Sequence, residues 1–418
     1  MTLIATKNTK FLVLLGDGMA DLPVPELGGR TPLQAARKPV LDALARRSVC
    51  GMVRTVPEGM PPGSDTANMS VMGYDSRLYY TGRSPIEAVS MGIRLADDDV
   101  AFRCNLVTLS GEPAYADRTM IDYSSDEIPT DVAAELIREV ERRLGGDGVS
   151  FYTGKSYRHC MVWSGGPLET RLTPPHDILT RRIAAYLPEG PGSERIRILM
   201  ETSAGFLEEL PANRARVAAG HRPANSVWIW GQGTRPKVPP LADRYPLRGS
   251  VISAVDLVKG LGICAGLRVV EVPGATGTLD TDFEGKAAAA IAEFASGQDY
   301  VYLHVEAPDE CGHRHEVDGK VRSIECIDGR VAAPLLDWLE RNRVATGEEY
   351  RVLVLPDHPT PLALRTHTSD PVPFLLFASD RVGTERAATA YDEEACARTG
   401  CFVAEGHTLF GSFVEGTL

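Results

Sequence analysis

Five of the nine histidines lie between residues 304 and 367, where acidic residues stand close to them in the chain. Asp309 and His313 are four residues apart, so on a helix both side chains would face the same way. Asp357 and His358 form a second pair of neighbours. Carboxylate oxygens and imidazole nitrogens that converge on one point suit Zn²⁺, Mn²⁺ or a related divalent ion. These residues are therefore candidate metal ligands.

Apolar runs before two aspartates indicate where their side chains would lie. Asp17 follows the run Phe11–Leu15 after one glycine, and Asp357 follows Val352–Leu355 after one proline. Such short runs are typical of buried parallel strands, and open α/β sheets bind ligands beyond the carboxyl ends of their strands. With His367, which stands in a polar loop, three carboxylates and three imidazoles could gather there. Two close divalent ions would then stabilise the attacking and leaving oxygens of a phosphoryl group.

Ser64 is the candidate nucleophile for such chemistry. It follows Pro61-Pro62-Gly63 and precedes the apolar residues Met69–Met72, so we predict it at the N-cap of a helix. A serine hydroxyl is a weak nucleophile near neutral pH, and metal coordination activates it without a histidine base. The free N–H groups of a helix N-terminus would also donate to phosphate oxygens.

Each of these signals also has a plainer explanation. Asp309 and His313 could be a surface pair on a helix, and Asp17, between two glycines, could simply form a turn. Ser64 could be a helix cap and nothing more. The joint pattern favours a metal-dependent site over these separate explanations. No Walker A or G-x-G-x-x-G sequence occurs, so nothing supports a P-loop nucleotide site.

The elements that must position these residues alternate between strand and helix in the last third of the chain. We expect them at Val269–Val272, Phe283–Phe294, Tyr300–Val305, Arg322–Arg341, Val352–Leu355 and Pro373–Phe377. Such alternation predicts a mainly parallel sheet with helices on both faces. The first segment has the same character, with a strand at Phe11–Leu15 and helices opening at Thr31 and Pro39.

The middle of the chain has a different pattern. Strands are expected at Asp99–Ser110, Met120–Tyr123, Val149–Thr153, His159–Trp163 and Val227–Trp230, and helices at Thr130–Leu144 and Glu194–Gly220. We therefore predict one α/β domain, residues 1–92 and 246–418, interrupted by an inserted α+β domain of residues 93–245. Proline and glycine are dense between residues 236 and 249, which indicates a linker.

Composition narrows the partners. The 418 residues carry a formal net charge of −12 and no basic block, which disfavours nucleic acid and anionic membranes. No apolar run approaches the roughly 20 residues that span a bilayer, and no secretory signal is evident. The eight cysteines contain no C-x-x-C pair, so we expect reduced thiols and a cytoplasmic protein. A homo-oligomer is possible, and the sequence leaves the oligomeric state open.

Several stretches in order along the chain together resemble the archaeal-type 2,3-bisphosphoglycerate-independent phosphoglycerate mutases, within the alkaline phosphatase superfamily. The matching stretches are Leu14–Met19, Pro62–Asn68, Tyr79–Arg83, Ala101–Leu106, Ile229–Gly233, Val272–Gly277, Glu306–Glu310 and Leu355–Pro361. The resemblance implies an alkaline-phosphatase-like fold. It also implies an isomerase of glycolysis and gluconeogenesis that interconverts 3-phosphoglycerate and 2-phosphoglycerate through a phosphoserine.

The resemblance further implies roles for the candidate residues. Ser64 would accept the phosphoryl group, and Lys286 would stabilise the phosphoryl oxygens. Two divalent ions are implied, with Mn²⁺ expected first and Zn²⁺, Co²⁺ or Mg²⁺ left open. The first metal would be held by Asp17, Asp357, His358 and Ser64 itself, and the second metal by Asp309, His313 and His367.

By the same resemblance the inserted domain would hold the glycerate end of a small phosphorylated metabolite. The candidates are Lys155, Arg158, His159, His176, Asp177 and Arg235. One departure stands after His176-Asp177, where the chain reads Ile178–Ile183 instead of the family's glycine-containing Ile-Thr-Gly-Lys type of turn. A related phosphotransferase or phosphatase acting on another metabolite, such as homoserine, therefore stays open as the alternative, and so does a catalytically idle metal-binding protein.

Overall fold

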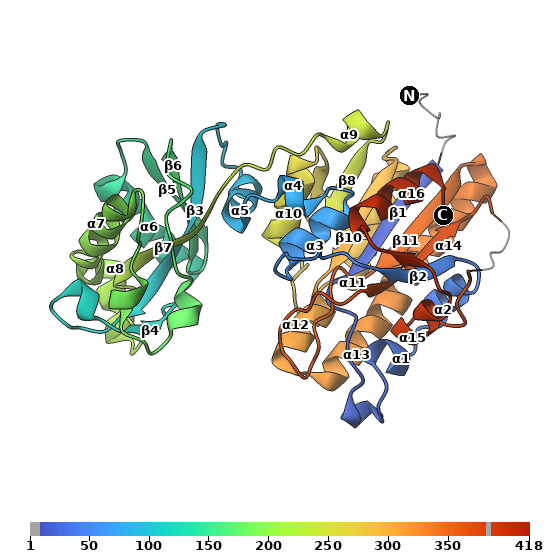
Figure 1. Cartoon of the computed structure of the whole chain (residues 1–418), viewed down its shortest axis with the longest axis horizontal. Helices are drawn as coiled ribbons and strands as arrows, with labels where there is room; N and C mark the ends of the chain where they lie inside the picture. Colours follow the sequence, from blue (N-terminus) through green and yellow to red (C-terminus); the bar gives the residue numbers. More distant parts are fainter. Residues whose placement is uncertain (1–8, 382–385) are drawn as a thin grey trace. The chain divides into compact units, whose positions relative to one another are not determined.

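The computed structural model describes residues 9–381 and 386–418, which form two compact units (Figure 1). The parallel-sheet unit comprises the described residues up to Tyr80 and from Lys237 onward, and the inserted unit comprises Thr81–Pro236. The boundaries therefore differ from the predicted 92/93 and 245/246. One reason is that α5 (Arg83–Ser90) packs on strands of the inserted unit. The predicted linker also contains a short helix, α9 (Leu241–Arg244), and Tyr74 of the parallel-sheet unit donates to the carbonyl of Pro239.

The parallel-sheet unit is built on eight strands in the order β13-β2-β12-β11-β1-β10-β8-β9. Their bounds are β1 (Thr9–Gly16), β2 (Val49–Val53), β8 (Gly249–Ile252), β9 (Arg268–Val270), β10 (Tyr300–Val305), β11 (Glu349–Leu355), β12 (Val372–Ala378) and β13 (Phe402–Val403). The run from β11 to β9 is parallel throughout, whereas β12 is antiparallel to both of its neighbours. The predicted mainly parallel sheet is confirmed.

Helices cover both faces of this sheet (Figure 1). They are α1 (Pro32–Ala35), α2 (Pro39–Ala45), α3 (Ser64–Val71), α4 (Ser76–Tyr79), α10 (Asp256–Cys264), α11 (Phe283–Ala295), α12 (Ala307–Arg314), α13 (Val317–Cys326), α14 (Ala333–Thr346), α15 (Glu393–Ala397) and α16 (Leu409–Glu415). Side chains alternate along β1, so Leu12 and Leu14 join the core under α2, α11 and α14. Phe11 faces the other way and packs edge-on against Phe413 of α16, with ring centroids 5.5 Å apart.

The long helix predicted over Arg322–Arg341 is interrupted. The chain leaves α13 through a π-helical turn, Ile327–Ala332, before α14 begins. Pro334 lacks an N–H and cannot complete the α-helical ladder at that point. The turn also carries Asp328, whose carboxylate accepts the backbone N–H groups of Val40 and Leu41 at the start of α2. Proline chemistry and this contact together account for the break.

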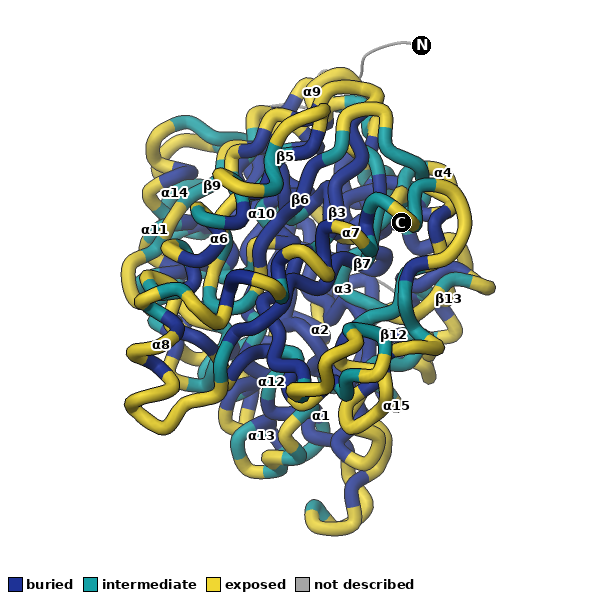
Figure 2. Tube along the Cα trace, turned by 90° about the vertical axis from the view of Figure 1, so that its left-hand side faces the viewer, coloured by how far each residue is buried: buried dark blue, intermediate teal, exposed yellow. Residues whose placement is uncertain are grey.

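The inserted unit has an antiparallel sheet in which β3 pairs with β4, β6 and β7. Its elements are β3 (Asp99–Leu109), β4 (Met120–Asp122), α6 (Thr130–Leu144), β5 (Val149–Lys155), β6 (Arg158–Ser164), α7 (Ser193–Ala204), α8 (Pro211–Ala218) and β7 (Ser226–Thr234). The strands β3 and β6 are largely buried (Figure 2), and α6 packs Leu136 and Ile137 into the same core. The helix at Thr130–Leu144 is where the sequence predicts it.

The two ends of the inserted unit lie side by side. The hydroxyl of Thr81 donates to the carbonyl of Thr234, and a side chain in place of Gly233 would collide with the carbonyl of Thr81. The inserted unit therefore begins and ends at one point. In the described part of the chain no helix is both long enough and apolar enough to cross a membrane.

Candidate active site

The candidate ligands meet at the carboxyl edge of the parallel sheet. In the sheet β1 lies between β10 and β11, so the residues that follow these three strands are neighbours. Asp17 follows β1, Asp357 follows β11, and Asp309 lies in α12, which begins two residues after β10. Two groups have their ligand atoms within 4.8 Å of one another, namely Asp17, Asp357, His358 and Asp309, His358, His367. His358 belongs to both groups and lies between them.

The first group fits a cation because it contains an unsatisfied carboxylate. Asp17 is buried, and its Oδ1 has no hydrogen-bond partner among the described residues. Burial, followed by the charges of Asp357 and Asp309, raises the pKa of Asp17 well above its usual value. Asp357 accepts hydrogen bonds from the N–H groups of Gly18 and His358, which orient its carboxylate. A divalent ion would satisfy the free oxygen and offset the repulsion between these carboxylates.

The second group is a carboxylate faced by imidazoles. His313 Nε2 lies 3.2 Å from Asp309 Oδ2, and His367 Nε2 lies 3.4 Å from Asp309 Oδ1. Burial opposes ionisation of Asp309, but its hydrogen bonds with these two histidines hold its pKa well below the usual value. The same contact raises the pKa of His313 to about 9. The predicted helical spacing of Asp309 and His313 is realised on α12.

Ser64 lies beside the first group, with its Oγ 3.1 Å from His358 Nε2. It is the first residue of α3, and Gly63, in an extended conformation, occupies the N-cap, so the predicted capping role of Ser64 is wrong. The Ser64 hydroxyl makes no capping hydrogen bond. Its position at the start of the helix places it among the N–H groups that lack helical acceptors.

Three polar residues that the sequence analysis did not single out complete the surroundings of Ser64. Asn68, one turn later on α3, donates 2.8 Å hydrogen bonds to both the carbonyl of Ser64 and Asp357 Oδ2. Tyr302 on β10 donates to Asn68 Oδ1 at 2.6 Å. His304, two residues along β10, lies 2.9 Å from Asp17 Oδ2 through its Nε2. Polar residues in a central strand that is otherwise apolar were the available signal for Tyr302 and His304.

Lys286 approaches the same edge from α11. The helix begins at Phe283 because the carboxylate of Asp282 caps it, accepting from the N–H of Gly285 at 2.8 Å. The Lys286 side chain is fully buried, and Nζ donates to the carbonyl of His304 at 3.0 Å. Burial lowers its pKa to about 8. Lys286 is therefore not a solvated cation at a helix start. Its amine contacts the backbone of His304, and the imidazole of His304 contacts Asp17.

The inserted unit holds a group that we call the arginine cluster: Arg83, Arg103, Arg158 and Glu87. Arg83 Nε and Arg103 Nε lie 2.7 and 3.4 Å from the Glu87 carboxylate. Burial opposes ionisation of Glu87, but the charges of Arg103, Arg83 and Arg158 lower its pKa. Arg103 also lies over the ring of Trp230, 4.7 Å from its centroid. Three guanidinium groups against one carboxylate leave this surface positive.

The structure separates the six candidates of the inserted unit. Arg158 belongs to the arginine cluster, and His176 packs edge-on against Trp230 at 5.4 Å. Asp177 lies 3.6 Å from His176. His159 is buried on the opposite face of β6 from Arg158, because successive side chains of a strand alternate.

Burial lowers the pKa of His159 to about 3 and leaves its Nε2 without a partner among the described residues. Lys155 is exposed and lies on β5 directly opposite Arg158, its cross-strand partner on β6, whereas Arg235 is exposed just after β7. Arg83 and Arg103 were not singled out, because nothing in their spacing distinguishes them from solvated surface charges; the available signal was that both lie in stretches that carry the family resemblance.

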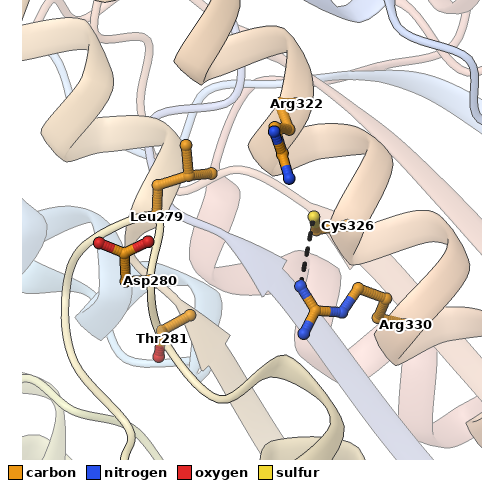
Figure 3. A pocket seen from close by; sticks show the side chains of 6 residues that line it. All are labelled: Leu279, Asp280, Thr281, Arg322, Cys326 and Arg330. Carbon is orange, nitrogen blue, oxygen red and sulfur yellow. Dashed lines mark hydrogen bonds between the residues drawn. The ribbon is translucent and has the colours of Figure 1, made fainter.

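A separate pocket of about 330 Å³ lies between α13, its π-helical extension and the loop before α11 (Figure 3). It is lined by Leu279, Asp280, Thr281, Arg322, Cys326 and Arg330. Arg330 donates to the sulfur of Cys326 and pairs with Glu284, and Asp280 provides a second negative charge. None of the candidate ligands lines this pocket, so we assign the chemistry to the sheet edge.

Comparisons with known proteins agree on one family. The family model described as 2,3-bisphosphoglycerate-independent phosphoglycerate mutase matches residues 45–213. A probable 2,3-bisphosphoglycerate-independent phosphoglycerate mutase from Geobacter sulfurreducens is 50% identical over 407 residues, covering 97% of this chain and 100% of the relative. A protein from Methanothrix thermoacetophila, named 2,3-bisphosphoglycerate-independent phosphoglycerate mutase, is 49% identical with the same coverage.

Solved structures show the same fold. A protein from Pyrococcus horikoshii superposes with a TM-score of 0.80 at 26% identity, covering 98% of this chain and 97% of its own. A cofactor-independent phosphoglycerate mutase from Thermoplasma acidophilum superposes with a TM-score of 0.65 at 23% identity, covering 98% of both chains.

Proposed function

Because this chain belongs to the family of 2,3-bisphosphoglycerate-independent phosphoglycerate mutases, we propose that it interconverts 3-phosphoglycerate and 2-phosphoglycerate through a phosphoserine at Ser64. This isomerisation is a step of glycolysis and gluconeogenesis. The observation that supports the assignment most is the position of the Ser64 hydroxyl, 3.1 Å from His358 Nε2. The same nitrogen lies 3.7 Å from Asp17 Oδ1, a buried oxygen without a hydrogen-bond partner among the described residues. The relatives do not favour homoserine as the acceptor.

The two ligand groups fit two divalent ions, and we propose Mn²⁺ for both. Asp17, Asp357 and His358 would hold the ion beside Ser64. Asp309, His313 and His367 would hold the second, because His313 Nε2 lies 3.2 Å from Asp309 Oδ2 and 3.0 Å from His367 Nε2, although His358 also lies within 4.8 Å of Asp309 and His367. When bound, such ions stabilise charge on phosphoryl oxygens and favour the ionised form of a neighbouring hydroxyl. Mixed oxygen and nitrogen donors also suit Zn²⁺, Co²⁺ and Mg²⁺, and a metal analysis distinguishes them.

The residues of the chain carry the two transfer steps. The Ser64 oxygen attacks the phosphorus of 3-phosphoglycerate in line; the Ser64–phosphorus bond forms as the bond to the 3-oxygen breaks. The hydroxyl proton of Ser64 is lost to this oxygen as glycerate leaves. Lys286 and the N–H groups at the start of α3 stabilise the equatorial oxygens. Asn68 keeps Ser64 in place by bonding both its carbonyl and Asp357.

The second step reverses the first on a different oxygen. Glycerate stays bound and reorients, and its 2-hydroxyl attacks the phosphoserine while Ser64 recovers a proton. Water must be excluded during this interval, because hydrolysis of the phosphoserine would make the protein a phosphatase. We propose that the arginine cluster holds the glycerate carboxylate, since guanidinium groups bind carboxylates in a bidentate way. None of the eight cysteines forms a disulfide in the described part of the chain, which fits a reducing cytoplasm.

A coupled assay tests the proposal directly. Protein loaded with Mn²⁺ is given 3-phosphoglycerate, and enolase converts any 2-phosphoglycerate into a product that absorbs in the ultraviolet. We expect turnover that does not depend on added 2,3-bisphosphoglycerate. Absence of turnover by the metal-loaded protein would overturn the mutase assignment, and dependence on 2,3-bisphosphoglycerate would overturn the phosphoserine route.

A further inference from the structure

A lysine lies buried beneath the ligand loops, outside both ligand groups. Lys320 is on α13, and its side chain is completely shielded from solvent. Its Nζ donates to Asp21 Oδ2 at 2.7 Å, to the carbonyl of Thr360 at 2.8 Å and to the carbonyl of Ala20 at 3.4 Å. One ammonium group thus satisfies three acceptors that come from two separate loops.

These two loops carry the ligands of the first group. Ala20 and Asp21 lie in the loop after β1 that begins with Asp17, and Thr360 follows the pair Asp357-His358 in the loop after β11. The loops also touch directly, because Thr360 N–H donates to the carbonyl of Ala20. Lys320 therefore joins two segments that are about 340 residues apart in the chain, as the hydrogen bond between Gly18 and Asp357 also does.

Thr360 extends this connection to the second group. Its hydroxyl donates to Asp309 Oδ1, and its Oγ1 lies 3.3 Å from His358 Nδ1. The packing around Thr360 is tight, because a side chain in place of Gly18 would come within 2.6 Å of Thr360 Oγ1. A shift of the Thr360 backbone would therefore move ligands of both groups together.

The charges of the ligands make such a connection necessary. Asp17, Asp309 and Asp357 lie close together, and without cations the repulsion between them favours separation of their loops. Lys320 makes no hydrogen bond to a ligand atom in the described residues, because its Nζ donates to Ala20, Asp21 and Thr360. Its positive charge attracts the acceptors of both loops and leaves the ligand oxygens available to cations.

We propose that Lys320 is a positioning residue that holds the two ligand loops in the arrangement that divalent ions require, so that the site is formed before they bind. This inference rests on the proposed function of the ligand groups. It predicts that the loss of Lys320 weakens metal binding itself, beyond any general loss of stability.

A second buried lysine in the same unit provides a matched control. Lys38 is 3% exposed and pairs with Asp42, with Nζ 3.1 Å from Oδ1. It lies at the start of α2 and makes no hydrogen bond or ion pair with a ligand loop in the described residues. Lys38→Met and Lys320→Met therefore both remove a buried ammonium from a carboxylate, and only one of them lies under the ligand loops.

The experiment measures metal affinity of the full-length protein after chelation. Co²⁺ is titrated into wild-type, Lys320→Met and Lys38→Met protein while its visible absorption is followed, and Mn²⁺ binding is followed by electron paramagnetic resonance. We expect Lys320→Met to raise the Kd by about 10–100-fold and to alter the Co²⁺ spectrum. Lys38→Met should lower the thermal unfolding temperature and leave the Kd and the spectrum unchanged.

The outcomes separate the two hypotheses. If the wild-type protein binds neither ion, the proposed metal site fails. If wild-type and Lys320→Met bind both ions equally well, the site stands and the positioning role of Lys320 is overturned. Should Lys320→Met not fold, Asp21→Asn replaces it, because it removes the charge that faces Lys320 and keeps an oxygen for the N–H of Leu362. We expect a smaller rise in Kd for Asp21→Asn, and an unchanged Kd would overturn the proposal.

Discussion

The two units gather their charged residues in opposite ways. In the parallel-sheet unit, strand ends bring Asp357 and His358 to one edge, where both are 0% exposed. In the inserted unit, Arg103 and Arg158 lie on strands of an antiparallel sheet and Arg83 lies on α5, with the side chain of Arg83 44% and that of Arg103 12% exposed. Parallel strands end together and meet at a single buried edge, whereas antiparallel strands distribute their polar side chains over a surface. We propose that the first arrangement serves bond breaking and the second recognition of the substrate.

The pKa shifts follow the same division. Burial, followed by repulsion from neighbouring carboxylates, raises the pKa of Asp17 in the parallel-sheet unit. In the inserted unit, surrounding guanidinium groups lower the pKa of Glu87 against the opposing effect of burial. The first site requires added positive charge, and the second already has it. Substitutions in the two units should therefore affect different kinetic constants.

The largest effect is expected for Ser64→Ala. Without the hydroxyl no phosphoserine can form, so kcat should fall by at least about 10⁴-fold. Metal content, measured by mass spectrometry, should stay near the wild-type value, because both ligand groups remain. Labelled phosphate from 3-phosphoglycerate should no longer be trapped on the protein. Retained turnover in this variant would rule out the phosphoserine step.

Asp17→Asn is expected to have the next largest effect. The variant removes a charge from the first ligand group and keeps the shape of the side chain. We expect the bound metal to drop by one ion and kcat to fall by at least about 100-fold. If Asp17 only shapes a turn, the metal content will be unchanged. That result would contradict the claim that the parallel-sheet unit requires added positive charge.

A change in the inserted unit should act on substrate binding. Arg103→Ala removes one guanidinium from the arginine cluster, so KM should rise by about 10–100-fold, as expected for a lost charge-assisted hydrogen bond. The kcat should change little, because the transferring atoms are elsewhere. Arg138→Ala, on the exposed face of α6, is the control and should match the wild type. A fall in kcat with unchanged KM would contradict a recognition role.

The smallest effect concerns stability and pH. Glu393 accepts hydrogen bonds from Thr31 and from the N–H of Asp21, and burial raises its pKa to about 7. A raised carboxyl pKa means that the folded state holds a proton that the unfolded state releases, so this group costs stability as pH rises from about 4.5 to 7. Compared with the wild type, Glu393→Gln should therefore gain more free energy of unfolding at pH 8 than at pH 5, with a difference of about 1–3 kcal/mol.

Glu87→Gln provides the contrast from the inserted unit. The lowered pKa of Glu87 gives stability that is present above its unfolded pKa and is lost only as the pH falls through its folded pKa. The variant should thus be destabilised to the same extent at pH 5 and pH 8. Thermal unfolding monitored by circular dichroism across this range checks both glutamates, and parallel curves for the two variants would contradict the difference between the units.

The sequence predicted that Asp17 and Asp357 lie together at one edge of the sheet, and it did so for a physical reason. Apolar runs mark buried strands, and the rule that parallel strands present ligands at their carboxyl ends then places Asp17 and Asp357 together. It could not reveal that Gly63 is the cap and Ser64 the first helical residue, because either position satisfies the same proline and glycine pattern. It also could not reveal Asn68 as the link between Ser64 and Asp357, since that role depends on tertiary contact.

The inserted unit was harder to predict. Because side chains alternate along a strand, the sequence of β6 was enough to place Arg158 and His159 on opposite faces. The prediction that both residues bind substrate did not take this alternation into account. The arginine cluster depends on α5 packing against β3, a contact between segments that no local pattern encodes. Recognition surfaces built from exposed charges leave weaker traces in a sequence than buried edges do.

Thr81 and Thr234, near the two ends of the inserted unit, are joined by a hydrogen bond, so the chain enters and leaves this unit at neighbouring positions. A chain that leaves and re-enters a fold at neighbouring positions can exchange what lies between them without rebuilding the sheet, so evolution can alter recognition while the ligand edge persists. Replacement of residues 81–236 by a short glycine linker should leave a protein that still binds Mn²⁺ and lacks mutase activity. Loss of metal binding in that deletion protein would show that the two parts do not separate in this way.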